Sequence, residues 1–182
     1  ELKQRDMEYK GEERASLRRA IALGALKYYL LKVDAHSELL YDPAASLDFQ
    51  GHTGPYLQYT HARLKSILRK AGVSENEGPD APHPLAESLS ADTLTPAELS
   101  LLRTLHRYPE MVAAIAHDYR LHAFANFLYE LAQRTNQFYV ENPVLEAPTP
   151  ELRTARLQLM AATAAVLKNG LAILGIEAPE RM

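Results

Sequence analysis

The sequence contains no cysteine, and this absence removes three kinds of chemistry at once. Without a thiol the chain forms no disulfide, binds no metal through thiolates and uses no cysteine nucleophile, although its cellular compartment stays open. No apolar stretch approaches the length that a membrane-spanning helix needs. The first residues, ELKQRDMEYK, are charged and lack an apolar core, so we expect no secretory signal. Because the chain does not begin with methionine, we expect it to be a fragment of a longer protein.

The motifs of common catalytic sites are also missing. The sequence has no GxSxG pattern, no glycine-rich phosphate loop and no HExxH pair. Its seven histidines are scattered, and the five-residue spacing of His117 and His122 is poor for two ligands on one helical face. We therefore expect no metal site and interpret the histidines as ordinary surface or core residues. No pair of carboxylates stands out for acid–base catalysis, so we expect no catalytic residue in this chain.

The composition is that of a water-exposed globular domain. The chain has 182 residues, of which 47% are hydrophobic and 24% are charged. A chain of this length forms one ordinary domain, residues 1–182, or two closely packed small ones, and buries roughly 70% of its unfolded surface. The net charge of -3 argues against general coating of nucleic acid but leaves room for a local basic site.

Helical periodicity covers most of the chain, and strand signals are almost absent. Apolar residues recur at helical spacing, and Thr95 to Glu98 form the pattern of a capping box at a helix start. Residues 73–90 carry acids, prolines and a glycine but no Lys or Arg, and we interpret them as a linker or surface loop. The fold class that we expect is therefore all-α, a helical bundle. We expect helices at 12–32, 43–47, 55–71, 121–141 and 150–174, one after the capping box, and one from Pro109.

One segment, GHTGPYLQYTHARLKSILRKAG at residues 51–72, differs from the rest in having four basic side chains and no acid. On the helix expected there, Leu57, Leu64, Ile67, Leu68 and Ala71 fall on one side, suited to a core. Tyr56, Tyr59, Arg63 and Lys70 fall on another side. Tyrosine rings offer a surface for unstacked bases, and arginine offers a fork for base edges or phosphate. The alternative is that the tyrosines pack partly in the core while the basic groups extend into water.

Several motifs follow one another in an order that resembles a known family. These motifs are GALKYYLLK at residues 24–32, the 51–72 segment, LTPAELSLLRTLHRYPEMV, NQFYVENPVL and ELRTARLQLMAATAAVLKNGLAILGIEAPERM. Together they resemble the C-terminal part of the arginyl-tRNA synthetases, which are class I aminoacyl-tRNA synthetases. The resemblance extends from about residue 12 to the last residue and includes the ending Glu180-Arg181-Met182.

The resemblance implies an α-helical anticodon-binding domain of the type named for an Asp-Ala-Leu-Arg motif, which corresponds here to residues 154–157. It implies an arginine-specific tRNA as partner, with no DNA or membrane partner, and a monomer in the cytoplasm. The full-length ligase of this family uses ATP and magnesium to attach arginine to its tRNA. The HIGH and KMSKS signatures of the ATP site are nowhere in these residues. We therefore expect this fragment alone to be without cofactor and without catalytic activity, and residues 1–32 to contain the helix that follows the absent catalytic domain.

The resemblance also implies which residues meet the anticodon loop. Tyr56 and Arg63 match the first family motif, Tyr139 matches the second and Met182 the third. The implied roles are base stacking for the tyrosines, a polar contact to the central anticodon base for Arg63, and a floor or backbone contact for Met182. Secondary candidates are Tyr59 and Lys70. For Tyr139 the alternative is core packing beside its neighbour in the sequence, and for Met182 it is a frayed terminus.

A second class of function stays open from the sequence, a helical protein-interaction domain that uses the same tyrosine and basic face. RNA binding should weaken steeply with salt and respond to anticodon base changes, whereas a protein interface need do neither. A stand-alone enzyme is a distant third interpretation, because the catalytic motifs are missing.

Overall fold

The computed structural model describes residues 11–73 and 94–182, and the regular elements in these two ranges are all helices. The expected linker at 73–90 falls almost entirely outside the described ranges. The expected helices are confirmed, and their observed ends differ from the predicted ends by at most one residue. Their bounds are α2 Glu12–Leu31, α3 Pro43–Ser46, α4 Gly54–Lys70, α5 Pro96–His106, α6 Tyr108–Asp118, α7 Leu121–Glu141 and α8 Pro150–Ile173.

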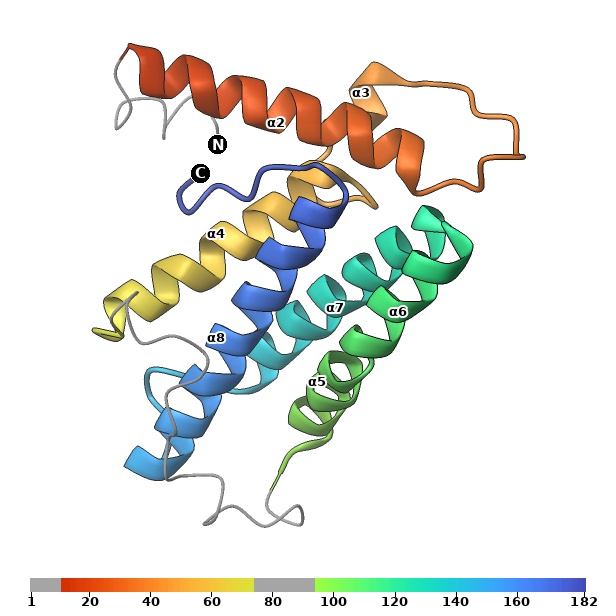
Figure 1. Ribbon diagram of the computed structural model, residues 1–182. Helices are drawn as coiled ribbons and strands as arrows, with labels where there is room; N and C mark the ends of the chain where they lie inside the picture. The colour runs from red at the N-terminus through yellow and green to blue at the C-terminus, as the bar shows by residue number, and fades with distance from the viewer. Residues whose placement is uncertain (1–10, 74–93) are drawn as a thin grey trace.

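Helix α2 crosses one end of the other long helices, as Figure 1 shows. Below it α4, α8 and α7 pack against one another, and α5 and α6 cover the remaining side of α7. The chain after α8 turns back along α4, so that residues 176–182 lie between α2 and α4 (Figure 1). None of the helices in the two described ranges is long and apolar enough to cross a membrane.

The apolar faces of these helices meet in two neighbouring clusters. Leu101, Phe138 and Leu167 lie in the first, formed by α4, α5, α7 and α8. Tyr28 and Phe124 lie in the second, which the ends of the helices nearest α2 surround. All five side chains are fully buried, and burying a side chain of this size stabilises the fold by roughly 1.5–3 kcal/mol. The four predicted core leucine and isoleucine positions of the 51–72 segment are also buried.

Two glycines allow α2 and α4 to approach closely. A Cβ atom at Gly54 would lie 2.2 Å from the carbonyl oxygen of Gly24, and a Cβ atom at Gly24 would lie 2.7 Å from the side-chain nitrogen of Gln58. Both distances are far below van der Waals contact. Gly54 therefore lets the start of α4 touch the α2 backbone, and Gly24 makes room for the Gln58 side chain.

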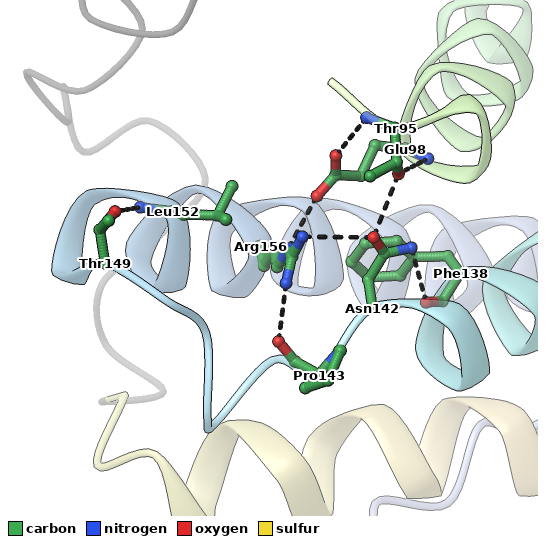
Figure 2. A network of polar contacts seen from close by, with 8 residues as sticks. All are labelled: Thr95, Glu98, Phe138, Asn142, Pro143, Thr149, Leu152 and Arg156. Atoms are coloured by element: carbon green, nitrogen blue, oxygen red, sulfur yellow. Dashed lines mark hydrogen bonds and ion pairs between the residues drawn. The ribbon is translucent and has the colours of Figure 1, made fainter. Parts of the chain in front are cut away.

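A buried polar network ties α5 to α8 (Figure 2). The Arg156 side chain of α8 donates to a Glu98 carboxylate oxygen at 2.7 Å, to the Pro143 carbonyl at 2.8 Å and to the Asn142 side-chain oxygen at 3.2 Å. The second Glu98 oxygen accepts the Thr95 backbone N–H, as the predicted capping box requires. Glu98 thus caps its own helix and neutralises the buried guanidinium of Arg156.

Candidate nucleic-acid interface

Helix α4 begins where the sequence predicts a start, and this start sets the direction of its side chains. The Thr53 hydroxyl accepts the Tyr56 backbone N–H at 3.3 Å, and Pro55 occupies the first turn, where no amide hydrogen is needed. The helix then places one face against the core and leaves the opposite edge open near its C-terminal end. Arg69 and Lys70 lie in the last turn, where cations interact favourably with the helix dipole.

A hollow of about 630 Å³ opens beside this end of α4, and we call it the Arg63 hollow. Its size is within the range of about 300–1,000 Å³ that is usual for small-molecule sites. Three parts of the chain form it, namely α4, the end of α7 and the last two residues. The lining residues are Tyr59, Ala62, Arg63, Ser66, Ile67, Arg69, Lys70, Tyr139, Arg181 and Met182. Five of the six residues that the sequence predicts for a binding site therefore meet in one place.

A cation–π pair in the Arg63 hollow joins Arg63 of α4 to Tyr139 of α7. The Arg63 guanidinium carbon lies 4.5 Å from the centroid of the Tyr139 ring, within the range of a cation–π interaction. Arg63 is exposed, and Tyr139 is half-buried with part of its ring packed against the core. Tyr139 therefore packs partly against the core and still reaches the hollow. Its neighbour Phe138, in contrast, is fully buried.

Cations dominate the charge of the Arg63 hollow. Arg63, Arg69, Lys70 and Arg181 line it, and no Asp or Glu is among the lining residues in the described part of the chain. The nearest acid in sequence, Glu180, directs its carboxylate toward Lys65 and Lys168 instead, at 3.8 and 3.7 Å. The hollow is thus suited to an anionic ligand that also presents a flat ring.

Tyr56 does not line the Arg63 hollow. Its ring centroid lies 5.4 Å from that of Tyr129, and its hydroxyl accepts a hydrogen bond from the Asn136 amide at 2.8 Å. Burial raises the pKa of the Tyr56 hydroxyl. The centroid of the His52 ring also lies close to that of Tyr129, at 4.0 Å. The structure thus separates Tyr56 from the other five predicted residues and places it in an aromatic group beside them.

Five lining residues of the Arg63 hollow are not among the predicted binding residues, namely Ala62, Ser66, Ile67, Arg69 and Arg181. The basic residues of α4 are visible in the sequence, and helical spacing places Arg69 near the face of Tyr59 and Arg63, but spacing alone does not show that it lines the hollow. Arg181 gave no signal, because it has no regular structure and reaches the site through the return of the chain along α4.

A second, larger hollow of about 760 Å³ lies between α5 and α8, and its lining is of a different kind. Leucine, alanine, valine and proline side chains such as Leu102, Leu105 and Ala162 form most of its surface. Its arginine, Arg156, is already engaged by Glu98 in the buried network. The larger hollow is therefore less suited to a nucleic acid than the Arg63 hollow.

The sequence matches one described protein family over most of its length. Residues 57–182 match the DALR anticodon binding domain. This range begins within α4 and includes α5 to α8 and every lining residue of the Arg63 hollow.

Two known proteins and one solved structure that are similar to the chain carry names of one kind. An arginine–tRNA ligase of Parabacteroides distasonis is 39% identical over 171 residues, which are 94% of this chain and 28% of that protein. An arginine–tRNA ligase of Chloroflexus aggregans is 43% identical over 94% of this chain and 29% of its own length. The chain thus spans between a quarter and a third of the length of these relatives. The solved arginyl-tRNA synthetase of Thermus thermophilus superposes with a TM-score of 0.83 at 34% identity, covering 100% of this chain and 29% of that one.

Proposed function

This chain belongs to the family of DALR anticodon-binding domains, and from that premise we propose that its Arg63 hollow binds the anticodon loop of an arginine-specific tRNA. The observation that carries the proposal is the meeting of two rings, four cations and Met182 in one hollow, whose lining in the described ranges includes no Asp or Glu side chain. The family relation and the basic, ring-bearing surface support the same ligand class. The helical protein-interaction domain, the second class considered from the sequence, has no comparable observation in its favour.

The chemistry of the Arg63 hollow fits single-stranded RNA better than a duplex. A duplex is bound along a long basic stripe, whereas a loop presents unstacked bases that stack on aromatic rings. In our proposal one loop base enters the hollow and stacks on Tyr139 or Tyr59. Such stacking contributes about 1–3 kcal/mol per base.

Arg63 is placed to distinguish the bound base from other bases. Its guanidinium lies over the Tyr139 ring, which limits its orientation before RNA arrives. A planar guanidinium that is already oriented loses little side-chain entropy when it donates to a base edge. Every arginine codon has guanine at its second position, so the matching central anticodon base is cytosine, whose carbonyl oxygen O2 and ring nitrogen N3 accept hydrogen bonds. We assign the polar contact with this base to Arg63.

The remaining cations serve the sugar–phosphate backbone in this proposal. Lys70 and Arg181 are exposed on the rim, and Arg69 is half-buried beside them. A loop that turns sharply brings successive phosphates close together, and cations of this kind offset their repulsion. Tyr56 and Asn136 lie next to the hollow and would support a neighbouring nucleotide.

For the longer protein we propose the activity of its relatives, attachment of arginine to tRNA. ATP and magnesium would then be bound outside residues 1–182, and this chain would act as the tRNA-reading part of a monomeric cytoplasmic ligase. Arginyl-adenylate formation by residues 1–182 alone would contradict this division of labour.

The proposal is tested by the affinity of the chain for RNA. An arginine-tRNA anticodon stem-loop with a fluorescent label is titrated by anisotropy at low salt, beside a stem-loop whose central anticodon base is changed. We expect the cytosine loop to bind more tightly, by about 1–3 kcal/mol or roughly fivefold to 150-fold, the size of one good base contact. Equal affinity for both loops would mean that the hollow attracts phosphate without reading a base. Absence of binding to either would contradict the proposal for this chain.

A further inference from the structure

The last two lining residues of the Arg63 hollow belong to a segment without regular structure, residues 176–182. The segment starts after Gly175, whose φ of +66° lets helix α8 end and the chain reverse. The Ile176 backbone N–H then bonds to the Leu171 carbonyl at 2.8 Å, and the Ile176 side chain is buried. From there the segment follows α4 (Figure 1), and its last two residues line the hollow.

Side chains of α4 hold the backbone of this segment at three points. The Gln58 side chain donates to the Glu177 carbonyl at 2.8 Å, and the Arg69 guanidinium donates to the Glu180 carbonyl at 3.2 Å. Between them, the His61 Nδ1 atom lies 3.0 Å from the Pro179 carbonyl oxygen. Since a carbonyl only accepts, the ring must carry its proton on Nδ1. The three donors are spaced by three and eight residues, so they lie along one side of α4.

Two of these donors are too deep in the protein to touch RNA. Gln58 and His61 are both 0% exposed. The second amide hydrogen of Gln58 points to the Ala20 carbonyl of α2 at 3.1 Å, so both of its donors are engaged by backbone. The His61 Nε2 atom is buried and has no hydrogen-bond partner among the described residues. Burying a polar group is costly unless it is hydrogen-bonded. The bonds of Gln58 and His61 to the carbonyls of Glu177 and Pro179 offset part of this cost and fix residues 177–179.

We propose that Gln58 and His61 are positioning residues, which place Arg181 and Met182 in the Arg63 hollow before RNA binds. The inference rests on the proposed function and extends it to residues that never contact the ligand. A segment without helix or strand would otherwise have to be ordered by the RNA itself, and that ordering would weaken binding. The α4 donors remove this cost, because they order the segment in the free protein.

The central test replaces the donor of His61. His61→Leu introduces an apolar side chain of similar size and loses the bond to Pro179, whereas His61→Asn keeps an N–H donor near the position of Nδ1. We expect His61→Leu to weaken stem-loop binding on the order of tenfold and His61→Asn to restore most of it. Leu101→Ala is the control for general destabilisation, because Leu101 is fully buried in α5 and lines neither hollow. It should lower the unfolding temperature and leave the affinity unchanged.

A second measurement follows the segment without RNA. The chain has four methionines, so methyl-labelled methionine gives few NMR signals, and Met182→Leu identifies the one from Met182. Near the rings of Tyr59 and Tyr139 this methyl signal should be displaced by ring currents. In His61→Leu we expect it to sharpen and to move to the position of an unstructured methionine. An unchanged signal would overturn the proposal.

A double-mutant cycle separates positioning from other effects of His61. In a chain that lacks residues 181 and 182, His61→Leu should weaken RNA binding no further, because the residues that it positions are gone. A full additional loss in that chain would overturn the proposal, as would unaltered binding by His61→Leu in the complete chain. Failure of the parent chain to bind any stem-loop would overturn the proposed function instead, and the methyl signal would still decide whether His61 holds the segment.

Discussion

The guanidinium of Arg63 lies over the ring of Tyr139, with 4.5 Å between the Arg63 Cζ atom and the ring centroid. The two residues come from α4 and α7, so their contact depends on the packing of the two helices. Each limits the freedom of the other: the ring offers its negative face to the cation, and the cation covers one part of the ring. A ligand therefore meets a cation and an aromatic ring in a fixed relation.

Two replacements of Tyr139 should distinguish the contribution of its ring to RNA binding from that of its hydroxyl group. We expect Tyr139→Ala to weaken stem-loop binding by about 1–3 kcal/mol, because both the stacking surface and the support of Arg63 are lost. Tyr139→Phe keeps the ring and should bind within a factor of about three of the parent, since stacking needs no hydroxyl. Titration by fluorescence anisotropy measures both, and equal losses in the two variants would show that the ring itself is not used.

The cations of the Arg63 hollow should appear in the salt dependence of binding. For single-stranded RNA the slope of log affinity against log salt is about -0.7 for each phosphate that is neutralised. We expect Lys70→Ala and Arg181→Ala each to reduce the magnitude of the slope by about 0.7. Arg103→Ala is the matched control, because Arg103 is exposed on α5 and lines neither hollow, and it should leave the slope unchanged. Slopes that do not change in the first two variants would remove these cations from the interface.

The buried network of Figure 2 predicts an asymmetry in stability. Arg156→Met leaves the Glu98 carboxylate buried without its cation, and we expect it to lower the free energy of unfolding by about 3–5 kcal/mol. The double variant Glu98→Gln/Arg156→Met should lose clearly less, because no charge is stranded and glutamine can still complete the capping box. Urea unfolding of the three proteins measures this. Equal losses in the single and double variants would contradict the account of the network.

Two histidines should make the fold sensitive to acid. Burial lowers the pKa of His61, with the Pro179 carbonyl opposing it and Lys65, Glu180 and Lys168 acting less strongly. Burial also lowers the pKa of His52, helped by Lys32. Both rings are therefore favoured as neutral groups in the folded protein. Their contribution to stability is complete above the unfolded pKa of about 6.5 and is lost as the pH falls through the lower folded values.

The measurement is the free energy of unfolding in urea at pH 7.5 and at pH 5. We expect a decrease on acidification that is smaller in His61→Asn, because that variant keeps the donor to Pro179 but has no ring to protonate. The same decrease in the parent and the variant would show that His61 does not contribute.

The sequence predicts much of this fold because its helix boundaries are marked by local chemistry. Thr95 and Glu98 form the capping box as expected, Gly175 ends α8, and α7 has the predicted bounds of 121–141. Local pattern also identifies the basic tyrosine face of α4. It does not show which residues of that face contact other helices. For this reason the pattern groups Tyr56 with the residues that line the Arg63 hollow, whereas the structure bonds Tyr56 to Asn136 of α7 outside the hollow.

Other features depend on contacts between segments far apart in the chain. Glu98 was predicted as a cap, but its pairing with Arg156 follows only from the packing of α5 on α8. His61 was interpreted as an ordinary core or surface histidine, and its bond to Pro179 requires the return of the chain along α4. Arg181 enters the Arg63 hollow by the same return. Spacing within one helix contains no information on such contacts.

The most direct test of the central claim is to find which residues touch the central anticodon base. A stem-loop with 5-iodocytidine at that position is bound to the chain and irradiated, and the crosslinked peptide is identified by mass spectrometry. The iodinated base crosslinks preferentially to aromatic and sulfur-containing side chains that lie against it. We predict a crosslink to Tyr139, Tyr59 or Met182, which share the Arg63 hollow. A crosslink confined to residues of α2, α5 or α6 would show that the loop binds elsewhere and would contradict the account.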